Sequence, residues 1–171
     1  MHPTSRLSKE DSEGKVDQKL NRGMSGSLLF LTSSRPDILF CVYLCARFQS
    51  DPRESHFTAV KRIFRYLKAT CNIVLLYQKS NDYKLIVLCD ADYASDILER
   101  KSTSGNWQFI GENLIPWASK RQSTIAMSTA EAEYISTAKC CTQLLWMKYQ
   151  LEDYQISSHN IPVYCNNSAA I

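Results

Sequence analysis

The chain has 171 residues, of which 44% are hydrophobic, and this allows one ordinary domain or two small ones with a buried core. A formal net charge of +3 is too small to indicate nucleic-acid binding, so such a function would need a local cluster of basic residues. No apolar run is long enough to span a membrane, and the N-terminus carries no apolar signal region.

The cysteines and histidines restrict the chemistry further. The seven cysteines form no C-x-x-C pair, and most of them lie in apolar segments. An odd number without a secretory leader predicts reduced thiols in a cytoplasmic or nuclear protein that is not secreted. His2, His56 and His159 are scattered along the chain, which argues against a zinc site.

The N-terminal part predicts a lead-in followed by helices. Residues 1–19 are polar and charged, which is typical of a flexible segment. Residues 20–32 favour a helix, Arg35-Pro36-Asp37 predicts a break with Asp37 as a cap, and residues 38–48 predict a strongly apolar helix.

Residues 53–68 predict a clearly amphipathic helix. Its apolar face consists of Val60, Ile63, Phe64 and Leu67. Its opposite face carries Lys61, Arg62, Arg65 and Lys68. These cations are typical either of an ordinary solvated face or of one that contacts phosphates, and both interpretations stay open.

An apolar run that ends on a carboxylate follows. Residues 71–77 predict a strand, and Ser80-Asn81-Asp82 predicts a turn and a domain boundary. Residues 84–92, KLIVLCDAD, predict a second strand covered on both faces. Asp90 then lies on a core-facing row, where a carboxylate is costly without a donor, a cation or a metal. The alternative is that Asp90 begins a turn or caps the next segment.

A hairpin is predicted next. Residues 106–110 and 114–118 are two strands joined by a turn at 111–113. Trp107 and Trp117 favour cross-strand packing over a role as base-stacking platforms.

Polar loops surround this hairpin. Asp92 and Asp96 are expected in a loop as solvated acids, and residues 100–105 are loop-like. Residues 119–122 predict a short loop in which Lys120 and Arg121 either touch a phosphate or face water.

A long helix is predicted from Ser128 to Tyr154. Ser128 and Glu131 form an S-x-x-E capping box at its start. Glu133 heads a largely apolar stripe that continues through Thr137, Cys140, Leu144, Met147 and Leu151. An acidic strand end and a core-facing acid on a helix suggest a shared divalent-metal site, although spacing alone does not establish it. Residues 161–165 predict another strand.

Several stretches together resemble one family. The runs are CDADYASD, RKSTSG, IPWASKRQSTIAMSTAEAEYI and VYCNNSAAI, and they are similar to the ribonuclease H region of copia-type retrotransposon Pol polyproteins. Upstream, GSLLFLTSSRPDILF and HFTAVKRIFRYLKAT resemble the segment that links the reverse transcriptase to that nuclease. The resemblance runs from about residue 20 to residue 171.

The resemblance implies an α/β fold with a mixed sheet, a truncated ribonuclease H-like fold preceded by a small helical thumb or connection segment. The expected organisation is a flexible lead-in at 1–19, a helical connection region at 20–80, and an incomplete ribonuclease H-like domain at 81–171. The helices and last strand that complete this fold in the family are missing. A sheet edge and one sheet face should therefore lie bare.

The resemblance also implies a nuclease that uses two Mg²⁺ ions to cut the RNA strand of an RNA–DNA hybrid. Asp90 and Glu133 match the first two acidic positions, which hold the metals. Asn166 occupies the third position, where the family has aspartate, and the fourth lies beyond residue 171. We expect weak Mg²⁺ binding or none, because two carboxylates supply too little charge for two dications.

Several functions stay open. The first is an inactive fragment of a transposable element, and the second is an enzyme fragment completed by another chain. No Tyr-x-Asp-Asp run is present, so reverse transcription by this chain alone is excluded. The third is a non-catalytic module that binds RNA–DNA hybrid or duplex through the basic helix at 61–68. Pol-like fragments are also labelled as secreted RxLR effectors, but this chain has no R-x-L-R run and residues 65–68 are RYLK. The expected partners are nucleic acid and the rest of the Pol polyprotein, with no membrane.

Overall fold

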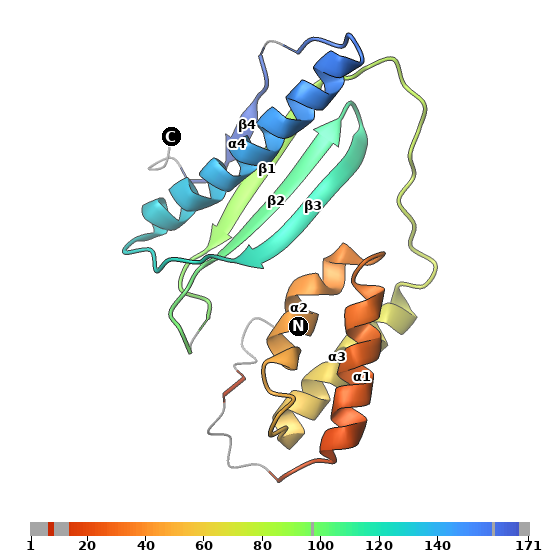
Figure 1. The fold of residues 1–171 in the computed structure, drawn as a ribbon, viewed down its shortest axis with the longest axis vertical. Helices are drawn as coiled ribbons and strands as arrows, with labels where there is room; N and C mark the ends of the chain where they lie inside the picture. Colours follow the sequence, from red (N-terminus) through yellow and green to blue (C-terminus); the bar gives the residue numbers. More distant parts are fainter. Residues whose placement is uncertain (1–6, 9–13, 97, 159, 168–171) are drawn as a thin grey trace. The chain divides into compact units, whose positions relative to one another are not determined.

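The chain forms two compact units, Met1–Val74 and Leu75–Ile171 (Figure 1). The computed structural model describes residues 7–8, 14–96, 98–158 and 160–167. Helices and a mixed four-stranded sheet are both present, which confirms the predicted α/β class. Among the described residues, no helix has the length and apolar character needed to cross a membrane.

The first unit is helical. It contains α1 (Gln18–Leu31), a 3-10 turn (Pro36–Ile38), α2 (Leu39–Ala46) and α3 (Glu54–Ala69). The helix α1 begins two residues before the predicted start, because the Asp17 carboxylate accepts hydrogen bonds from the first backbone N–H groups. All three helices contribute to one apolar core, whose buried members are Leu7, Leu28, Ile38, Val42, Cys45, Phe48, Ala59, Val60 and Ile63.

The break before α2 is held by a polar network rather than by a helix cap. Arg35 donates two hydrogen bonds to the carboxylate of Asp37, at 3.0 and 2.7 Å, and Tyr66 donates a third at 2.9 Å. The prediction of Asp37 as a side-chain cap was therefore wrong, since its oxygens bind side chains instead of the helix. The hydrogen bond from Arg35 holds the pKa of Asp37 below its ordinary value.

A buried histidine fixes the start of α3. His56 is 1% exposed, stacks on Phe48 with ring centroids 4.1 Å apart, and accepts a hydrogen bond from the Arg53 backbone at its Nδ1. Its Nε2 lies 2.9 Å from the carbonyl oxygen of Ser8. The contact joins α3 to a residue of the predicted lead-in, of which residues 1–6 and 9–13 lie outside the described residues.

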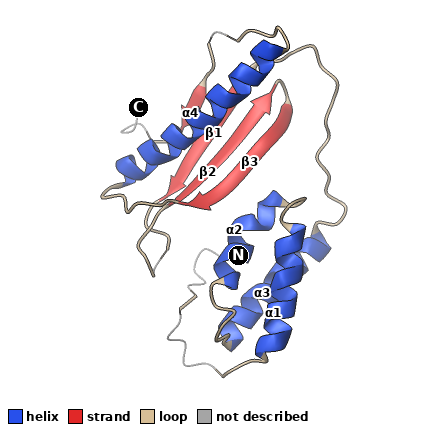
Figure 2. Cartoon of the chain, viewed as in Figure 1, coloured by secondary structure: helices blue, strands red, loops and turns tan. Residues whose placement is uncertain are grey.

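The strand predicted at residues 71–77 is absent, so that prediction was wrong. The segment is a connector without strand structure between α3 and the second unit, and every residue in it is exposed (Figure 2). Strand propensity does not suffice where no neighbouring strand supplies hydrogen bonds to the backbone.

The second unit is built on a sheet. Its strands are β1 (Leu85–Asp92), β2 (Thr103–Ile110), β3 (Asn113–Arg121) and β4 (Val163–Cys165), in the order β3-β2-β1-β4. β1 pairs antiparallel with β2 and parallel with β4. The predicted hairpin of β2 and β3 is confirmed, and Trp107 lies opposite Trp117 across it as expected.

The hairpin strands extend further than predicted. Residues 103–105 and 119–121 were expected in loops, but Thr103 pairs with Arg121 at the open end of the ladder. The Arg121 guanidinium is 2.8 Å from the Asp96 carboxylate, whose side chain is only 7% exposed. The prediction of Asp96 as a solvated acid was therefore wrong, because this ion pair ties the loop after β1 to the end of β3.

The helix α4 (Thr129–Asp153) covers one face of the sheet. The Ser128 hydroxyl accepts a hydrogen bond from the Glu131 N–H at 3.1 Å, which confirms the predicted start. The core between helix and sheet consists of Leu85, Val87, Cys89, Cys140, Leu144 and Met147. Among the described residues of this unit, no helix covers the other face, on which Leu88 and Trp107 are each 39% exposed.

Candidate acidic site at the ends of β1 and β4

Asp90 lies near the end of β1, and its carboxylate already has a hydrogen-bond donor. The side-chain amide nitrogen of Asn166, directly after β4, donates to Oδ1 of Asp90 at 3.0 Å. Parallel pairing of β1 with β4 brings the two residues together, since Cys89 lies opposite Cys165 one position earlier in each strand. The Ser136 hydroxyl of α4 donates to the backbone carbonyl of Asp90 at 2.8 Å, which fixes this strand end against the helix.

Glu133 is the buried acid of the site, with 4% of its surface exposed. It lies in the first two turns of α4 and reaches the sheet with both oxygens. Oε1 accepts a hydrogen bond from the backbone N–H of Ala91 at 3.1 Å, and Oε2 accepts one from the Cys165 thiol at 3.5 Å. These donors offset part of the cost of burying the carboxylate.

The structure thus gathers the three residues that the sequence singled out. Asp90, Glu133 and Asn166 come from β1, α4 and the end of β4, and they meet where the two parallel strands end. Sequence reasoning missed two residues that position them, Ser136 and Cys165. The spacing of Ser136 from Glu133 on one helix face could have indicated the first, because residues three apart are neighbours on a helix.

The donor set at this site does not fit a two-metal centre. Within the part of the chain that the structure describes, no group of three or more His, Cys, Asp or Glu side chains is placed to hold a metal ion. Glu133 uses its two oxygens on protein donors, and Asn166 directs an N–H toward Asp90 where a metal would require an oxygen. Mg²⁺ prefers charged oxygen ligands in octahedral geometry, so this arrangement offers too few of them.

The Cys89 thiol beside the site is not poised as a nucleophile. Cys89 is buried under α4, and its sulfur lies 3.2 Å from the Thr137 hydroxyl. Burial raises the pKa of the Cys89 thiol above its ordinary value, more than the hydrogen bond of Thr137 lowers it. A protonated thiol is a poor nucleophile, and covalent catalysis by this cysteine is therefore disfavoured.

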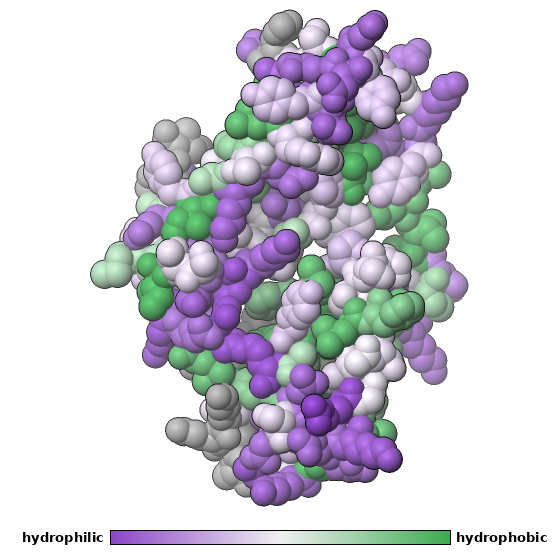
Figure 3. All heavy atoms as spheres, viewed as in Figure 1, coloured by the Kyte–Doolittle hydropathy of each residue, from purple (hydrophilic) through white to green (hydrophobic). Residues whose placement is uncertain are grey.

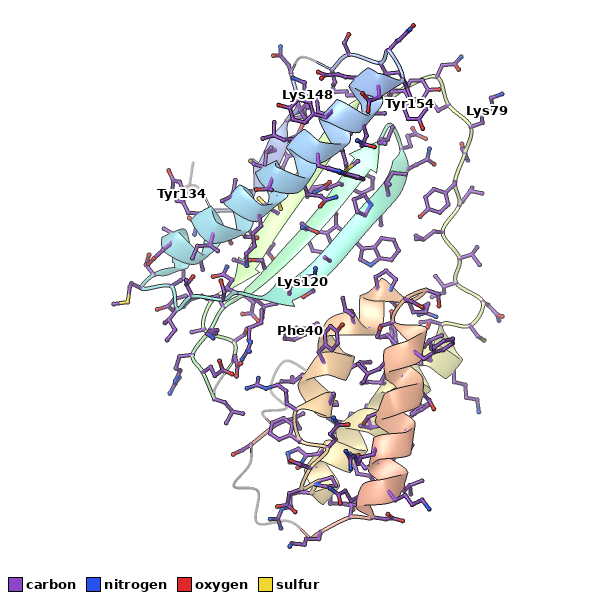
Figure 4. All side chains as sticks on the ribbon, in the orientation of Figure 1. Phe40, Lys79, Lys120, Tyr134, Lys148 and Tyr154 are labelled. Carbon is purple, nitrogen blue, oxygen red and sulfur yellow. The ribbon has the colours of Figure 1, made fainter. Side chains whose placement is uncertain are left out.

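The basic residues singled out by the sequence divide into two groups. Lys61, Arg62, Arg65 and Lys68 are all exposed on α3, whose opposite face is buried. The ammonium of Lys61 lies over the ring of Phe57, 3.9 Å from its centroid. In the second unit, Lys120 is exposed toward the end of β3 (Figure 4), whereas the guanidinium of Arg121 is occupied by Asp96 and Glu99.

Comparison with known proteins finds transposon polyproteins along nearly the whole chain. The chain is 36% identical over 171 residues to the retrovirus-related Pol polyprotein from transposon RE1 of Arabidopsis thaliana, which covers 99% of this chain and 12% of that protein. It is 37% identical over 147 residues to the retrovirus-related Pol polyprotein from transposon TNT 1-94 of Nicotiana tabacum, covering 85% of this chain and 11% of the relative. The chain thus spans about one eighth of the length of the first relative.

A shorter relative matches along most of its own length. The chain is 34% identical over 123 residues to the secreted RxLR effector protein 161 of Plasmopara viticola, which covers 71% of this chain and 87% of that protein. No family model and no solved structure matches the chain.

Proposed function

Because the chain belongs to the copia-type retrotransposon Pol polyprotein family, we propose that it is a segment of such a polyprotein from the end of the reverse transcriptase region into a ribonuclease H-like domain. The mixed sheet with β4 parallel to β1, and α4 across one face, supports this assignment of the second unit. We further propose that the segment does not cleave RNA–DNA hybrids in its present form.

The hydrogen bond from Asn166 to Asp90 carries the proposal of inactivity. An aspartate at position 166 would face Asp90 across 3.0 Å with a second negative charge, and this pair would need a cation. The N–H of the asparagine amide instead donates a hydrogen bond to Oδ1 of Asp90, so this oxygen has a partner without a metal. Two carboxylates without a third also supply too little charge to hold the two Mg²⁺ ions of this chemistry.

The direct test is a cleavage assay with the purified chain, an RNA–DNA hybrid and Mg²⁺. We expect the hybrid to stay intact over hours, at the background rate seen in the presence of a chelator. Mg²⁺-dependent cleavage by the unaltered chain would overturn the proposal of inactivity and restore the enzyme interpretation.

A titration with Mg²⁺ tests the role of position 166 itself. We expect Asn166→Asp to bind Mg²⁺ at least about tenfold more tightly than the unaltered chain, since it adds a charged oxygen ligand beside Asp90. Asn167→Asp is the matched control, because it adds the same charge one residue away. Equal gains in the two variants would show a general effect of charge and would refute a specific role for residue 166.

A second function rests on the basic face of α3. We propose that Lys61, Arg62, Arg65 and Lys68 contact the phosphates of duplex nucleic acid. All four are exposed on one helix, and no ion pair between described residues involves any of them. Their charges are therefore available to replace the counterions of a nucleic-acid backbone.

The salt dependence of duplex binding measures this function. If all four residues contact phosphates, the slope of log K against log salt is about −3.6, from about −0.9 for each contact. Replacing the four residues by glutamine should bring the slope close to zero. Lys139→Gln, at an exposed position of α4, and Lys148→Gln, at a half-buried lysine paired with Glu152, are the controls and should leave the slope unchanged. A slope that survives the fourfold replacement would exclude this face as the contact.

The proposed setting of the chain follows from the same family. Its partners would be an RNA–DNA hybrid or duplex and the remainder of the polyprotein, in the cytosol or the nucleus. All seven cysteines are free thiols in the structure, which supports a reducing compartment. A disulfide found in the purified native protein would contradict this location.

A further inference from the structure

The connector between the two units exposes a continuous apolar run. From Ile73 to Tyr77 the exposed fractions are 70, 80, 49, 74 and 54%. Figure 3 shows hydrophobic residues at the surface along this segment. A run of five exposed apolar residues, two of them β-branched, has strong strand propensity. Any partner that covers this run lowers the free energy by removing apolar surface from water.

The outer edge of the sheet at β3 lacks a partner strand. β3 is the terminal strand in the order β3-β2-β1-β4, and the described residues place no strand beside it. The backbone N–H and C=O groups that point outward from such an edge can pair with an added strand.

One contact already joins the connector to the start of this edge. The side-chain amide of Asn113, the first residue of β3, accepts a hydrogen bond from the Gln78 N–H at 2.9 Å and donates one to the Gln78 carbonyl at 2.9 Å. Asn113 thus offers Gln78 one donor and one acceptor, as an opposing residue does in an antiparallel pair. Gln78 directly follows the apolar run.

We propose that residues 73–77 add to the free edge of β3 as a short antiparallel strand, with the Gln78–Asn113 contact as its anchor. Moving back along the connector from Gln78 and forward along β3 from Asn113 gives opposite chain directions, as antiparallel pairing requires. In the structure, residues 73–77 are in the unpaired state.

The edge favours the chain's own segment over a strand from another molecule. Lys120 and Arg121 place charges at the far end, which discourages an added strand along the whole of β3. In the register set by Gln78 opposite Asn113, residues 73–77 lie opposite residues 114–118 and stop before these charges. Pro116 lacks an N–H, so this pairing loses at most one hydrogen bond there. A segment tethered at Gln78 has a high effective concentration there, which a separate molecule lacks.

Hydrogen exchange of the full-length chain, followed by mass spectrometry, tests this inference. We expect the backbone amides of residues 74–77 to exchange at least about tenfold more slowly than in the Asn113→Ala variant, which lacks the anchor. Leu76→Asp should remove the protection in a second way, by placing a charge in the pairing segment. The matched control is Met127→Asp, at an apolar residue that is 82% exposed in a loop of the same unit.

Two results would overturn the inference. One is exchange of residues 74–77 at the rate of an unstructured peptide in the unaltered chain, while residues 85–92 of β1 stay protected and show an intact sheet. The other is protection that rises with protein concentration together with a dimer in sedimentation, because the occupant of the edge would then be a second copy. Neither result bears on the cleavage or duplex-binding assays, so this inference and the proposed function fail independently.

Discussion

The two units use their polar side chains in different ways. In the helical unit, Arg35, Asp37 and Tyr66 form a network that holds a chain break, and His56 fixes a helix start. In the sheet unit, the buried polar groups meet at a strand end, where Glu133 faces residues of β1 and β4. The first arrangement stabilises connections, whereas the second assembles a site.

The sites also differ in the sequence separation that they bridge. Among the hydrogen bonds that join Arg35, Asp37 and Tyr66 in the helical unit, the largest separation, between Asp37 and Tyr66, is 29 residues. Asp90 and Asn166 are 76 residues apart. The acidic site therefore forms only if the parallel pairing of β1 with β4 forms. A change that weakens this pairing should affect the site before it affects the helical unit.

The largest expected effect comes from placing a charge in one core. Val60 is fully buried among the three helices. Val60→Asp should destabilise the helical unit by more than about 4 kcal/mol, since an unpaired charge in an apolar core is among the costliest substitutions. Hydrogen exchange should then show loss of protection in α1 to α3 while β1 and β2 stay protected.

Thr58→Asp is the matched control for Val60→Asp, because it places the same charge on a half-buried position of the same helix. It should leave both units protected. Equal loss of protection in both units of the Val60→Asp variant would show that the two units unfold in one cooperative transition. Their stabilities would then not be independent.

A glycine in each unit should respond with the opposite sign. Gly111 has a φ of +58° in the hairpin turn, and an added Cβ would lie 2.6 Å from the carbonyl oxygen of Asp82. Gly111→Ala should cost about 2 to 3 kcal/mol through backbone strain and this clash.

Gly26 lies on the exposed face of α1 with no atom within 4 Å of an added Cβ. Gly26→Ala should stabilise the helical unit by about 0.5 to 1 kcal/mol.

Denaturant titration of both glycine variants measures these changes. A destabilising effect of Gly26→Ala would mean that its helix face is covered in solution. A neutral Gly111→Ala would mean that the hairpin turn adopts another conformation than the left-handed one.

The sequence predicted local features better than the partners of distant residues. Ser128 was identified as the start of α4 from a four-residue pattern, and Asp90 and Glu133 were singled out from strand and helix periodicity. The ion pair of Asp96 with Arg121 was missed, because nothing in either local pattern encodes the other residue. The strand expected at 71–77 failed for the same reason, since a strand requires a neighbour that propensity does not supply.

Alkaline pH should destabilise both units through their buried thiols. Burial raises the pKa of Cys45 in the helical unit and of Cys140 in the sheet unit to about 12. An unfolded cysteine has a pKa of about 8.5, so above this pH the unfolded chain loses protons that the folded chain keeps. The free energy of unfolding should therefore be unaffected below about pH 8 and should fall by up to about 1.4 kcal/mol per pH unit and thiol between about pH 9 and pH 12.

Cys45→Ala should reduce the alkaline slope of the helical unit and Cys140→Ala that of the sheet unit, measured by denaturant titration from pH 8 to pH 10.5. Cys71→Ala is the matched control, because Cys71 is exposed and its removal should leave the slope unchanged. A slope that does not respond to either buried cysteine would assign the alkaline loss to other groups.

A similarly small effect concerns buried side-chain amides that lack any hydrogen-bond partner; among the described residues, each unit has one. Gln108 in β2 is 0% exposed and Asn21 in α1 is 1% exposed, and neither side-chain amide has a partner. Gln108→Met and Asn21→Leu should each stabilise the chain by about 1 kcal/mol in denaturant titration, because an apolar group of similar size has no hydrogen bonds to lose.

Gln122→Met is the control with the opposite sign. The Gln122 amide nitrogen donates to Ser104 and to the Ala132 carbonyl, at 2.9 Å each, so this variant should be destabilised by about 1 to 3 kcal/mol. If Gln108→Met and Asn21→Leu were instead destabilising, both amides would have hydrogen-bond partners in solution. Neither unit would then carry the free-energy cost of a buried amide without a partner.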